Sequence, residues 1–283
     1  RNDGQGRLTD VTEAAGLSAE RPSLGAVSVD FDNNGWPDLL LAGAGRTYLF
    51  RNMGKDRFED VSAAAGLDSI TDVCLGAAWL DLDQDGDLDL ILCRFAASPA
   101  EAVEALSGRS PTGGGLAVFV NTGVADPVPA GAFYGGLSVK FRRAPDLEKV
   151  WTVSHRPISA VVSDVDGDLD IDVIVFVHQG PAQLLENQRL LRWKRHELIS
   201  PGPTPGANWG LPIDVDQDGR NDLFRVASSS PSQLVWNRSL PGEDPARSFE
   251  SGPTFDNLRQ ARTADMDLDG WPDVITLSSE GRI

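Results

Sequence analysis

Aspartates recur at alternate positions of a nine-residue pattern, D-x-D-x-(D/N)-G-x-x-D, which occurs five times in this chain, counting near copies. Carboxylates at positions 1, 3 and 5 of a tight loop converge on one point, and glycine at position 6 allows the positive φ that turns the chain back. Oxygen ligands in this arrangement are what a hard cation such as calcium requires. We name the copies the first to fifth loops; they span residues 30–38, 81–89, 164–172, 214–222 and 265–273.

Each loop can supply a set of oxygen ligands. Side chains at positions 1, 3, 5 and 9, with the backbone carbonyl at position 7, approach the roughly six to eight ligands that calcium accepts. The predicted ligands are Asp30, Asp32, Asn34, Trp36 and Asp38 in the first loop, Asp81, Asp83, Asp85, Asp87 and Asp89 in the second, Asp164, Asp166, Asp168, Asp170 and Asp172 in the third, Asp214, Asp216, Asp218, Arg220 and Asp222 in the fourth, and Asp265, Asp267, Asp269, Trp271 and Asp273 in the fifth. We therefore predict about four to five bound calcium ions.

Two observations qualify these sites. An EF-hand loop needs glutamate at position 12, and the residues there are Leu41, Leu92, Val175, Arg225 and Thr276. The loops are therefore hairpin loops. The third loop departs from the pattern, with Gly167 at position 4 and Leu169 where glycine should be, so its geometry is shifted or its site is degraded. The alternative is that these segments are only polar turns. That interpretation would suit a single copy but does not explain five, because crowded carboxylates repel one another without a counter-ion.

The spacing of the loops predicts the fold. Their first aspartates are 51, 83, 50 and 51 residues apart, and short runs rich in Val, Leu and Ile flank them. Such repeats indicate an all-β fold, a β-propeller of four-stranded antiparallel blades. We predict a single domain over residues 1–283, with repeats starting near 24, 73, 158, 208 and 260. The five repeats form a closed five-bladed ring or part of a larger, for example seven-bladed, propeller, with residues 1–12 the outer strand of the last or preceding blade.

The composition excludes several classes of function. The net charge is −17, and the loops hold 21 of the 42 acidic side chains. A chain this acidic is a poor candidate for nucleic-acid binding. There is no apolar run of ~18 residues that could span a membrane. The three histidines share no ligand spacing, and no hydrolase or phosphate-binding motif occurs, so we do not expect an enzyme.

The repeated loop resembles the FG-GAP/VCBS repeat family, the type found in integrin α-subunit propellers. Residues 2–17 and their copy at 52–67 resemble the cartilage-acidic-protein-like (ASPIC/UnbV-associated) subgroup. The resemblance implies a calcium-binding propeller that is extracellular, at the cell surface or periplasmic, and that serves adhesion, protein interaction or scaffolding. Two alternatives remain: a carbohydrate-active enzyme (polysaccharide lyase or hydrolase) or glycan-binding propeller, and a structural subunit of a larger assembly.

Two further predictions concern single residues. Loops on the face opposite the calcium loops are longer, so we expect another protein or a surface glycan to bind there, with Trp209 as an anchor. Cys74 and Cys93 flank the second loop and fall nearly opposite each other on a simple hairpin, within disulfide range. We predict a disulfide between them; the alternative is two buried free thiols.

Overall fold

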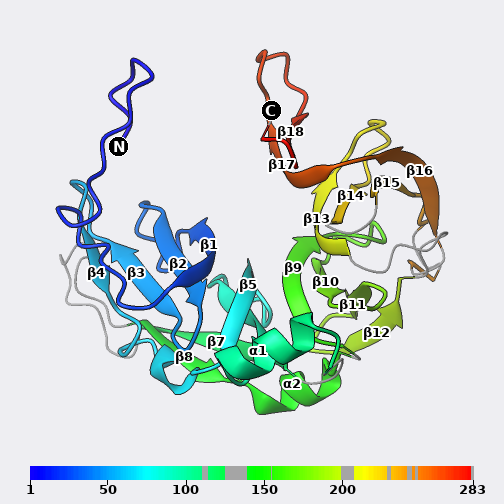
Figure 1. Cartoon of the computed structure of the whole chain (residues 1–283). Coiled ribbons are helices and arrows are strands. Elements are labelled where there is room, and N and C mark those ends of the chain that lie inside the picture. The colour runs from blue at the N-terminus through cyan, green and yellow to red at the C-terminus, as the bar shows by residue number, and fades with distance from the viewer. Residues whose placement is uncertain are drawn as a thin grey trace.

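The fold is all-β, and a computed structural model describes residues 1–109, 114–124, 139–153, 155–198, 207–227, 231–240, 244–245 and 248–281. Five antiparallel sheets follow one another along the chain, four of them with four strands and the last with two. They stand side by side as the blades of a propeller, in an arc that is open between the first and the last sheet (Figure 1). The predicted propeller of antiparallel blades is confirmed, and the arc does not close into a five-bladed ring.

Each sheet follows the chain without crossovers. The first has β1 (Ser23–Val29), β2 (Asp38–Gly43), β3 (Tyr48–Asn52) and β4 (Phe58–Asp60), and the second has β5 (Val73–Leu80), β6 (Asp89–Ala96), β7 (Gly115–Val124) and β8 (Val139–Arg143). The third has β9 (Pro157–Ser163), β10 (Asp172–Val177), β11 (Gln183–Asn187) and β12 (Trp193–Glu197). The fourth has β13 (Ala207–Ile213), β14 (Asp222–Ala227), β15 (Ser232–Asn237) and β16 (Phe249–Phe255), and the fifth has β17 (Leu258–Ala264) and β18 (Asp273–Ser278). The five aspartate loops are the turns between the first two strands of each sheet.

Helices are few and lie at the end of the blades away from the aspartate loops. They are α1 (Pro99–Leu106), between β6 and β7, α2 (Pro145–Val150), between β8 and β9, and the short 3₁₀ helix η1 (Leu67–Ser69). The Ser98 hydroxyl caps α1 by accepting from the Glu101 N–H at 3.2 Å, and Pro99 suits the first helical turn. No described helix is long and apolar enough to cross a membrane.

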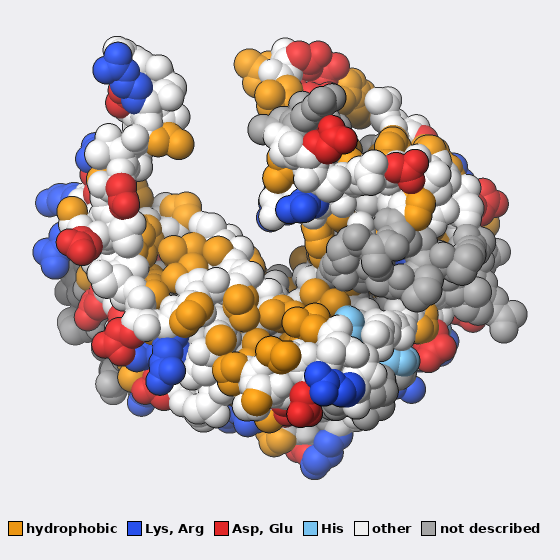
Figure 2. All heavy atoms as spheres, viewed as in Figure 1, with side chains coloured by type: hydrophobic (Ala, Val, Ile, Leu, Met, Phe, Trp, Pro, Cys, Tyr) orange, Lys and Arg blue, Asp and Glu red, His pale blue; other side chains and the backbone are white. Residues whose placement is uncertain are grey.

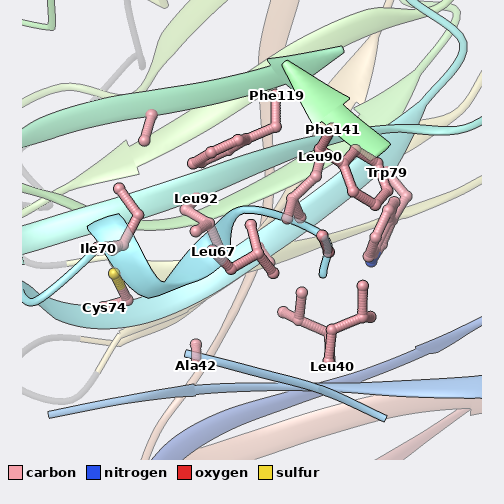
Figure 3. Close-up of a cluster of buried hydrophobic side chains, with 14 of the residues drawn as sticks. Leu40, Ala42, Leu67, Ile70, Cys74, Trp79, Leu90, Leu92, Phe119 and Phe141 are labelled. Atoms are coloured by element: carbon pink, nitrogen blue, oxygen red, sulfur yellow. The ribbon is translucent and has the colours of Figure 1, made fainter. Parts of the chain in front are cut away.

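The core lies between neighbouring sheets. The second strands β10 and β14 are buried at every position, as expected for strands covered on both faces. Between the first and second sheets, Leu40 from β2 packs with Trp79 from β5 and Phe141 from β8 (Figure 3). The Trp79 and Phe141 ring centroids are 5.8 Å apart. Similar clusters fill the later junctions, so each blade is stabilised by burying its faces against the next.

The N-terminal residues repeat a turn seen inside the first sheet. A bridge joins Asn2 and Leu8, just as Asn52 pairs with Phe58 where β3 meets β4. The side chain of Asn2 accepts from the Gly4 N–H at 2.9 Å. The equivalent bond between Gly54 and Asn52 is 3.0 Å. The same local sequence therefore forms the same turn twice. Its assignment as an outer strand of a blade stays a prediction.

The predicted disulfide is wrong, because Cys74 and Cys93 are free thiols. A β-bulge pairs Cys74 with Arg94 and Gly76 with Cys93, so the two cysteines are not opposite each other. Cys74 packs between the first and second sheets and Cys93 between the second and third. The bulge fits Gly76, since a Cβ there would lie 2.8 Å from the Ile158 carbonyl oxygen. Burial raises the pKa of Cys74 to about 11, as expected of a buried unreactive thiol.

Candidate metal loops

The five loops have left-handed residues at the same two positions. In the regular loops φ is positive at position 4 and at position 6; in the second loop it is 62° at Gln84 and 94° at Gly86. Position 6 is the glycine that the sequence pattern singled out. The left-handed residue at position 4 is the part of the loop that the pattern did not reveal, because Asn, Gln and Leu all occur there.

The third loop keeps this conformation. Its Gly167 at position 4 has φ of 75° and its Leu169 at position 6 has φ of 72°. The glycine therefore lies in the other left-handed position, and Leu169 adopts a backbone conformation that costs roughly 1–2 kcal/mol for a residue with a side chain. Both left-handed positions are therefore retained, while the amide that donates to Asp164 is shifted by one residue, from position 5 to position 4. The departure from the pattern thus includes local strain at Leu169, and a degraded site stays a prediction.

Backbone amides hold the carboxylate at position 1. In the first loop, Asp30 accepts from the Asn34 N–H at 3.0 Å and from the Gly35 N–H at 2.8 Å. The side chain at position 5 accepts in turn from the N–H at position 7, at 2.8 Å between Asn34 and Trp36. The second, fourth and fifth loops repeat all three contacts. In the third loop Asp164 accepts instead from the Gly167 N–H at 2.8 Å and from the Leu169 N–H at 3.0 Å. The loop is thus folded around its own acidic side chains before any cation is considered.

Three carboxylate oxygens lie within 4.8 Å of one another in every loop. The groups are Asp30, Asp32 and Asp38; Asp81, Asp83 and Asp85; Asp164, Asp166 and Asp172; Asp214, Asp216 and Asp218; and Asp265, Asp267 and Asp269. In the first loop Asp32 Oδ1 is buried and makes no hydrogen bond. A hard cation suits these donors, since they are all oxygen and mostly anionic. The residues therefore fit calcium, and three of the predicted ligands come together in each loop.

The carboxylate at position 9 has a structural role that the sequence did not reveal. Asp89 is fully buried and accepts from the Leu82 N–H at 2.7 Å and from the Asn121 N–H at 2.6 Å. It thereby ties its loop to the third strand of the sheet. Asp38, Asp172 and Asp222 make the same pair of bonds. In the fifth loop Asp273 accepts from the Met266 N–H at 2.8 Å and is exposed.

Burial shifts the acidity of these groups. Desolvation raises the pKa of Asp38, Asp89 and Asp172 to about 7, although their backbone hydrogen bonds act in the opposite direction. The pKa of Asp166 rises to about 6, first through desolvation and then through the nearby charge of Asp168. A bound cation would oppose every one of these shifts, because it favours the ionised carboxylate.

Asparagines at the end of the third strands join the loops of neighbouring blades. Asn121 donates through Nδ2 to the Phe31 carbonyl of the first loop at 3.3 Å. Asn237 donates in the same way to the Val165 carbonyl of the third loop at 2.8 Å. The sequence contained this signal, since an asparagine stands at or near the end of the third strand of each four-stranded sheet, but nothing in it indicated a contact between blades.

Arginines enter three of the loops, and the sequence analysis missed them. Arg51 Nε lies 2.5 Å from Asp32 Oδ2 in the first loop, and Arg189 Nε lies 2.5 Å from Asp170 Oδ2 in the third. In the fourth loop Arg238 Nη1 lies 2.6 Å from Asp216 Oδ2. Each arginine stands within two residues of the closing asparagine, which is the signal that could have revealed them.

Coordination of an ion by the position 7 carbonyl oxygens stays a prediction. The side chains of the position 7 residues make different contacts in different loops. Trp36 and Trp271 are exposed by 54% and 51%, and a Cβ at Gly54 would lie 3.4 Å from the Trp36 ring. Trp36 therefore covers the turn between β3 and β4. Arg220 turns back to Asp218, with 2.5 Å between Nη2 and Oδ2.

Trp209 does not project from a loop. It lies within β13, half-buried against the fifth sheet, and the Arg262 guanidinium carbon is 5.0 Å from its ring centroid. The strand runs from Ala207 to Ile213, and the Pro- and Gly-rich residues 199–206 before it lie outside the described residues. The role of Trp209 as a projecting anchor is therefore not supported by its position.

A family model described as FG-GAP-like repeat matches residues 30–92 and 214–276. These stretches contain the first, second, fourth and fifth loops, and the third loop lies outside them. No curated protein matches the chain in sequence.

Among solved structures, the chain is similar to a lectin of Agrocybe aegerita described for specific recognition of non-reducing terminal N-acetylglucosamine, with a TM-score of 0.48 at 14% identity over 91% of this chain and 61% of that one. It is also similar to BBS1N, solved in complex with ARL6DN, with a TM-score of 0.41 at 11% identity over 92% of this chain and 77% of that one. The chain spans about three fifths of the length of the lectin. Neither likeness indicates what this chain binds.

Proposed function

We propose that this chain is a calcium-stabilised β-propeller domain, residues 1–283, that acts as an interaction or scaffold module and not as an enzyme. The observation that carries the proposal is the gathering of three carboxylate oxygens within 4.8 Å in each of five loops. Carboxylates this close repel one another unless a cation lies among them. About four to five calcium ions would supply that neutralisation.

The chain's own residues prepare the loops for the cation. Backbone N–H groups hold the position 1 carboxylates, and the position 9 carboxylates are fixed by two N–H groups in the four-stranded sheets. The donors are therefore gathered in advance, which reduces the entropy lost on binding. The side chains at positions 1, 3, 5 and 9 would hold calcium, and the position 7 carbonyl would complete the set.

We infer an extracellular, cell-surface or periplasmic location from the FG-GAP-like repeats and from the resemblance to cartilage-acidic-protein-like chains. Calcium sites of extracellular modules are often weak, with Kd of roughly 10⁻⁴–10⁻³ M, so surroundings rich in calcium would keep the loops loaded. Fractionation of cells that make the native protein tests the location. Recovery from the cytosol alone would contradict it.

The partner surface is proposed on the face opposite the loops. β6 begins at the second loop and ends next to α1, so α1 lies on that opposite face. Its Val103 and Leu106 are exposed by 64% and 66%, and Leu24 at the start of β1 is exposed by 50%. Apolar side chains gather in the middle of this face, over α1 and the strands beside it (Figure 2). Exposed apolar patches of this kind often mark interaction sites.

A thermal melt with and without chelator tests the calcium proposal. Calcium that binds only the folded protein stabilises it by mass action, so we expect the melting temperature to rise with calcium concentration and to fall with chelator. Magnesium is the control, because it keeps its waters and prefers a tight octahedron, and we expect a smaller rise. An unchanged melting temperature in calcium would overturn the proposal.

A photo-cross-linking residue tests the partner surface. It replaces Leu106 on α1 or, as the matched control, Leu268 of the fifth loop, which is 86% exposed. We expect cross-links to a protein from position 106 and none from position 268 in the native setting. Cross-links from position 268 alone would place the partner on the loop face.

Glycan binding is the second candidate, favoured by the exposed rings of Trp36 and Trp271 beside acidic loops. Exposed aromatic rings can present their apolar faces to a ligand. Trp36→Ala and Trp271→Ala should then abolish oligosaccharide binding in a fluorescence titration with calcium present. Binding that survives both substitutions, or no binding by the wild type, would remove this candidate.

A further inference from the structure

Two arginines occupy the fourth loop. Arg238, directly after β15, places Nη1 2.6 Å from Asp216 Oδ2 and 3.1 Å from Asp218 Oδ2. Arg220, within the loop, places Nη2 2.5 Å from Asp218 Oδ2. Both contacted carboxylates belong to the cluster that would hold calcium. The carboxylates at positions 3 and 5 of this loop therefore already have cationic partners.

The first and third loops each have one arginine on an acidic side chain; Asp32 belongs to the cluster of the first loop, whereas Asp170 lies beside the cluster of the third, at position 7. The pair of Arg51 and Asp32 is almost wholly buried, with 7% and 2% of the two side chains exposed. Arg189 pairs with Asp170 and also donates from Nη2 to the Asp168 carbonyl oxygen at 3.2 Å. A buried charge pair is costly to separate, since either partner would be left without compensation.

The second and fifth loops differ. Across the parts of the chain that the structure describes, no ion pair is recorded for Asp81, Asp83 and Asp85 of the second loop or for Asp265, Asp267 and Asp269 of the fifth. In the second loop a neutral group approaches instead, with Asn33 Nδ2 donating to Asp87 Oδ1 at 3.1 Å. Their carboxylates have only backbone amides and neutral side chains to oppose their mutual repulsion.

A guanidinium group is well suited to act as a counter-ion. It stays charged at any working pH and matches the geometry of a carboxylate. A calcium ion entering the same cluster must displace the guanidinium from its carboxylate or lie beside a like charge, and both weaken binding. At the second and fifth loops it meets neither cost. The donor sets of the second and fourth loops are otherwise alike, with aspartate at positions 1, 3 and 5.

We propose that Arg51, Arg189, Arg220 and Arg238 act as tethered counter-ions, so that the first, third and fourth loops stay folded without calcium, and that tight calcium binding belongs to the second and fifth loops. This inference rests on the proposed function and refines it. It divides five similar acidic loops into two that need calcium and three that bind it weakly.

Calorimetric calcium titration of the whole chain tests the division. The wild type is expected to show two tight sites, with the remaining sites at least tenfold weaker. Arg220→Gln with Arg238→Gln should add a third tight site by strengthening the fourth loop at least tenfold. Arg259→Gln is the matched control, because Arg259 is exposed on β17 and has no recorded ion pair among the described residues; it should leave the titration unchanged.

Substitutions in the loops identify the sites. Asp83→Asn with Asp85→Asn should remove one tight site, and Asp216→Asn with Asp218→Asn should remove none. Should the double arginine variant fold poorly, Arg189→Gln, whose side chain is 59% exposed, offers the same test at the third loop. A gain of one tight site there supports the proposal, and an unchanged titration counts against it.

The outcomes separate this inference from the proposed function. Four or five equal sites in the wild type, unaltered by the arginine substitutions, would overturn the counter-ion role and leave calcium binding intact. No calcium heat in any variant, together with a melting temperature that chelator does not change, would overturn both. Two tight sites that become three would support both.

Discussion

The second and fourth loops have the same fold and almost the same carboxylates, yet their charges are balanced in different ways. Desolvation and the charges of Asp85 and Asp81 raise the pKa of Asp83 in the second loop. In the fourth loop desolvation also acts on Asp218, but the Arg220 N–H and the guanidinium groups of Arg220 and Arg238 outweigh it and lower the pKa. Asp83 at position 3 of the second loop and Asp218 at position 5 of the fourth therefore shift in opposite directions.

The comparison teaches that shape and charge are separate properties of these loops. The left-handed residues at positions 4 and 6 and the bonds of the position 9 aspartate fix the shape in both. The charge depends on whether an arginine follows the third strand. A repeated pattern of aspartates therefore predicts a loop more securely than it predicts an ion.

The largest effect should come from the position 9 aspartates and should be equal in the two loops. Asp89→Ala and Asp222→Ala each leave two backbone N–H groups without their acceptor, at about 1–3 kcal/mol each, so we expect a loss of roughly 3 kcal/mol in the free energy of unfolding. Urea unfolding in chelator measures it. Asp273→Ala, at an exposed position, is the control. A much milder effect at Asp222 would show that the arginines also support the loop's shape.

Loss of calcium stabilisation should be the next largest effect and should separate the loops. At a calcium concentration of 100 Kd one site stabilises the fold by about 2.7 kcal/mol. Asp83→Asn with Asp85→Asn should remove an increment of that order from the difference between unfolding in calcium and in chelator. Asp216→Asn with Asp218→Asn should remove far less. Equal losses would erase the distinction between the loops.

The pH dependence of the calcium-free protein should be smaller. The folded pKa of Asp38, Asp89 and Asp172 is about 7, above the ~3.9 of an unfolded aspartate. Their contribution is therefore full below the unfolded pKa and lost as pH rises through about 7. We expect the melting temperature in chelator to fall between roughly pH 4 and pH 7, and calcium to reduce the fall. A melting temperature that rises over this range in chelator would contradict the shifts.

The smallest effect should come from Arg238 in chelator. Its side chain is 35% exposed, and exposed ion pairs contribute about 0–1 kcal/mol. Arg238→Gln should therefore lower the free energy of unfolding only slightly without calcium. The deficit should shrink in saturating calcium, because the ion replaces the lost charge. A deficit that grows in calcium would mean that Arg238 assists the ion instead of opposing it.

The sequence predicted the blades and the acidic loops because both follow from local patterns. Alternating and apolar runs specify strands, and aspartates spaced two apart specify a cluster whatever the rest of the fold does. The sequence pattern marked only the glycine of position 6, whereas the structure has left-handed residues at positions 4 and 6, which in the third loop are Gly167 and Leu169.

The features that were missed depend on distant parts of the chain. The bulge that separates Cys74 from Cys93 arises where β5 approaches β9 at Gly76. Arg238 and Asp216 form an ion pair although they are 22 residues apart in the sequence, and no local pattern predicts a contact over that separation. The half-buried place of Trp209 follows from its packing on the next blade. These contacts are set by how sheets pack, which spacing along the sequence does not encode.

The bond from Asn121 to the Phe31 carbonyl, repeated from Asn237 to Val165, also bears on how such an array can grow. Each such blade offers an asparagine to the neighbour on one side and can present a carbonyl to the neighbour on the other. A blade that is duplicated or deleted as a whole therefore includes both the donor asparagine and the acceptor carbonyl. The number of blades can therefore change over evolutionary time without new contacts having to arise between neighbouring blades, provided that each added blade keeps its asparagine.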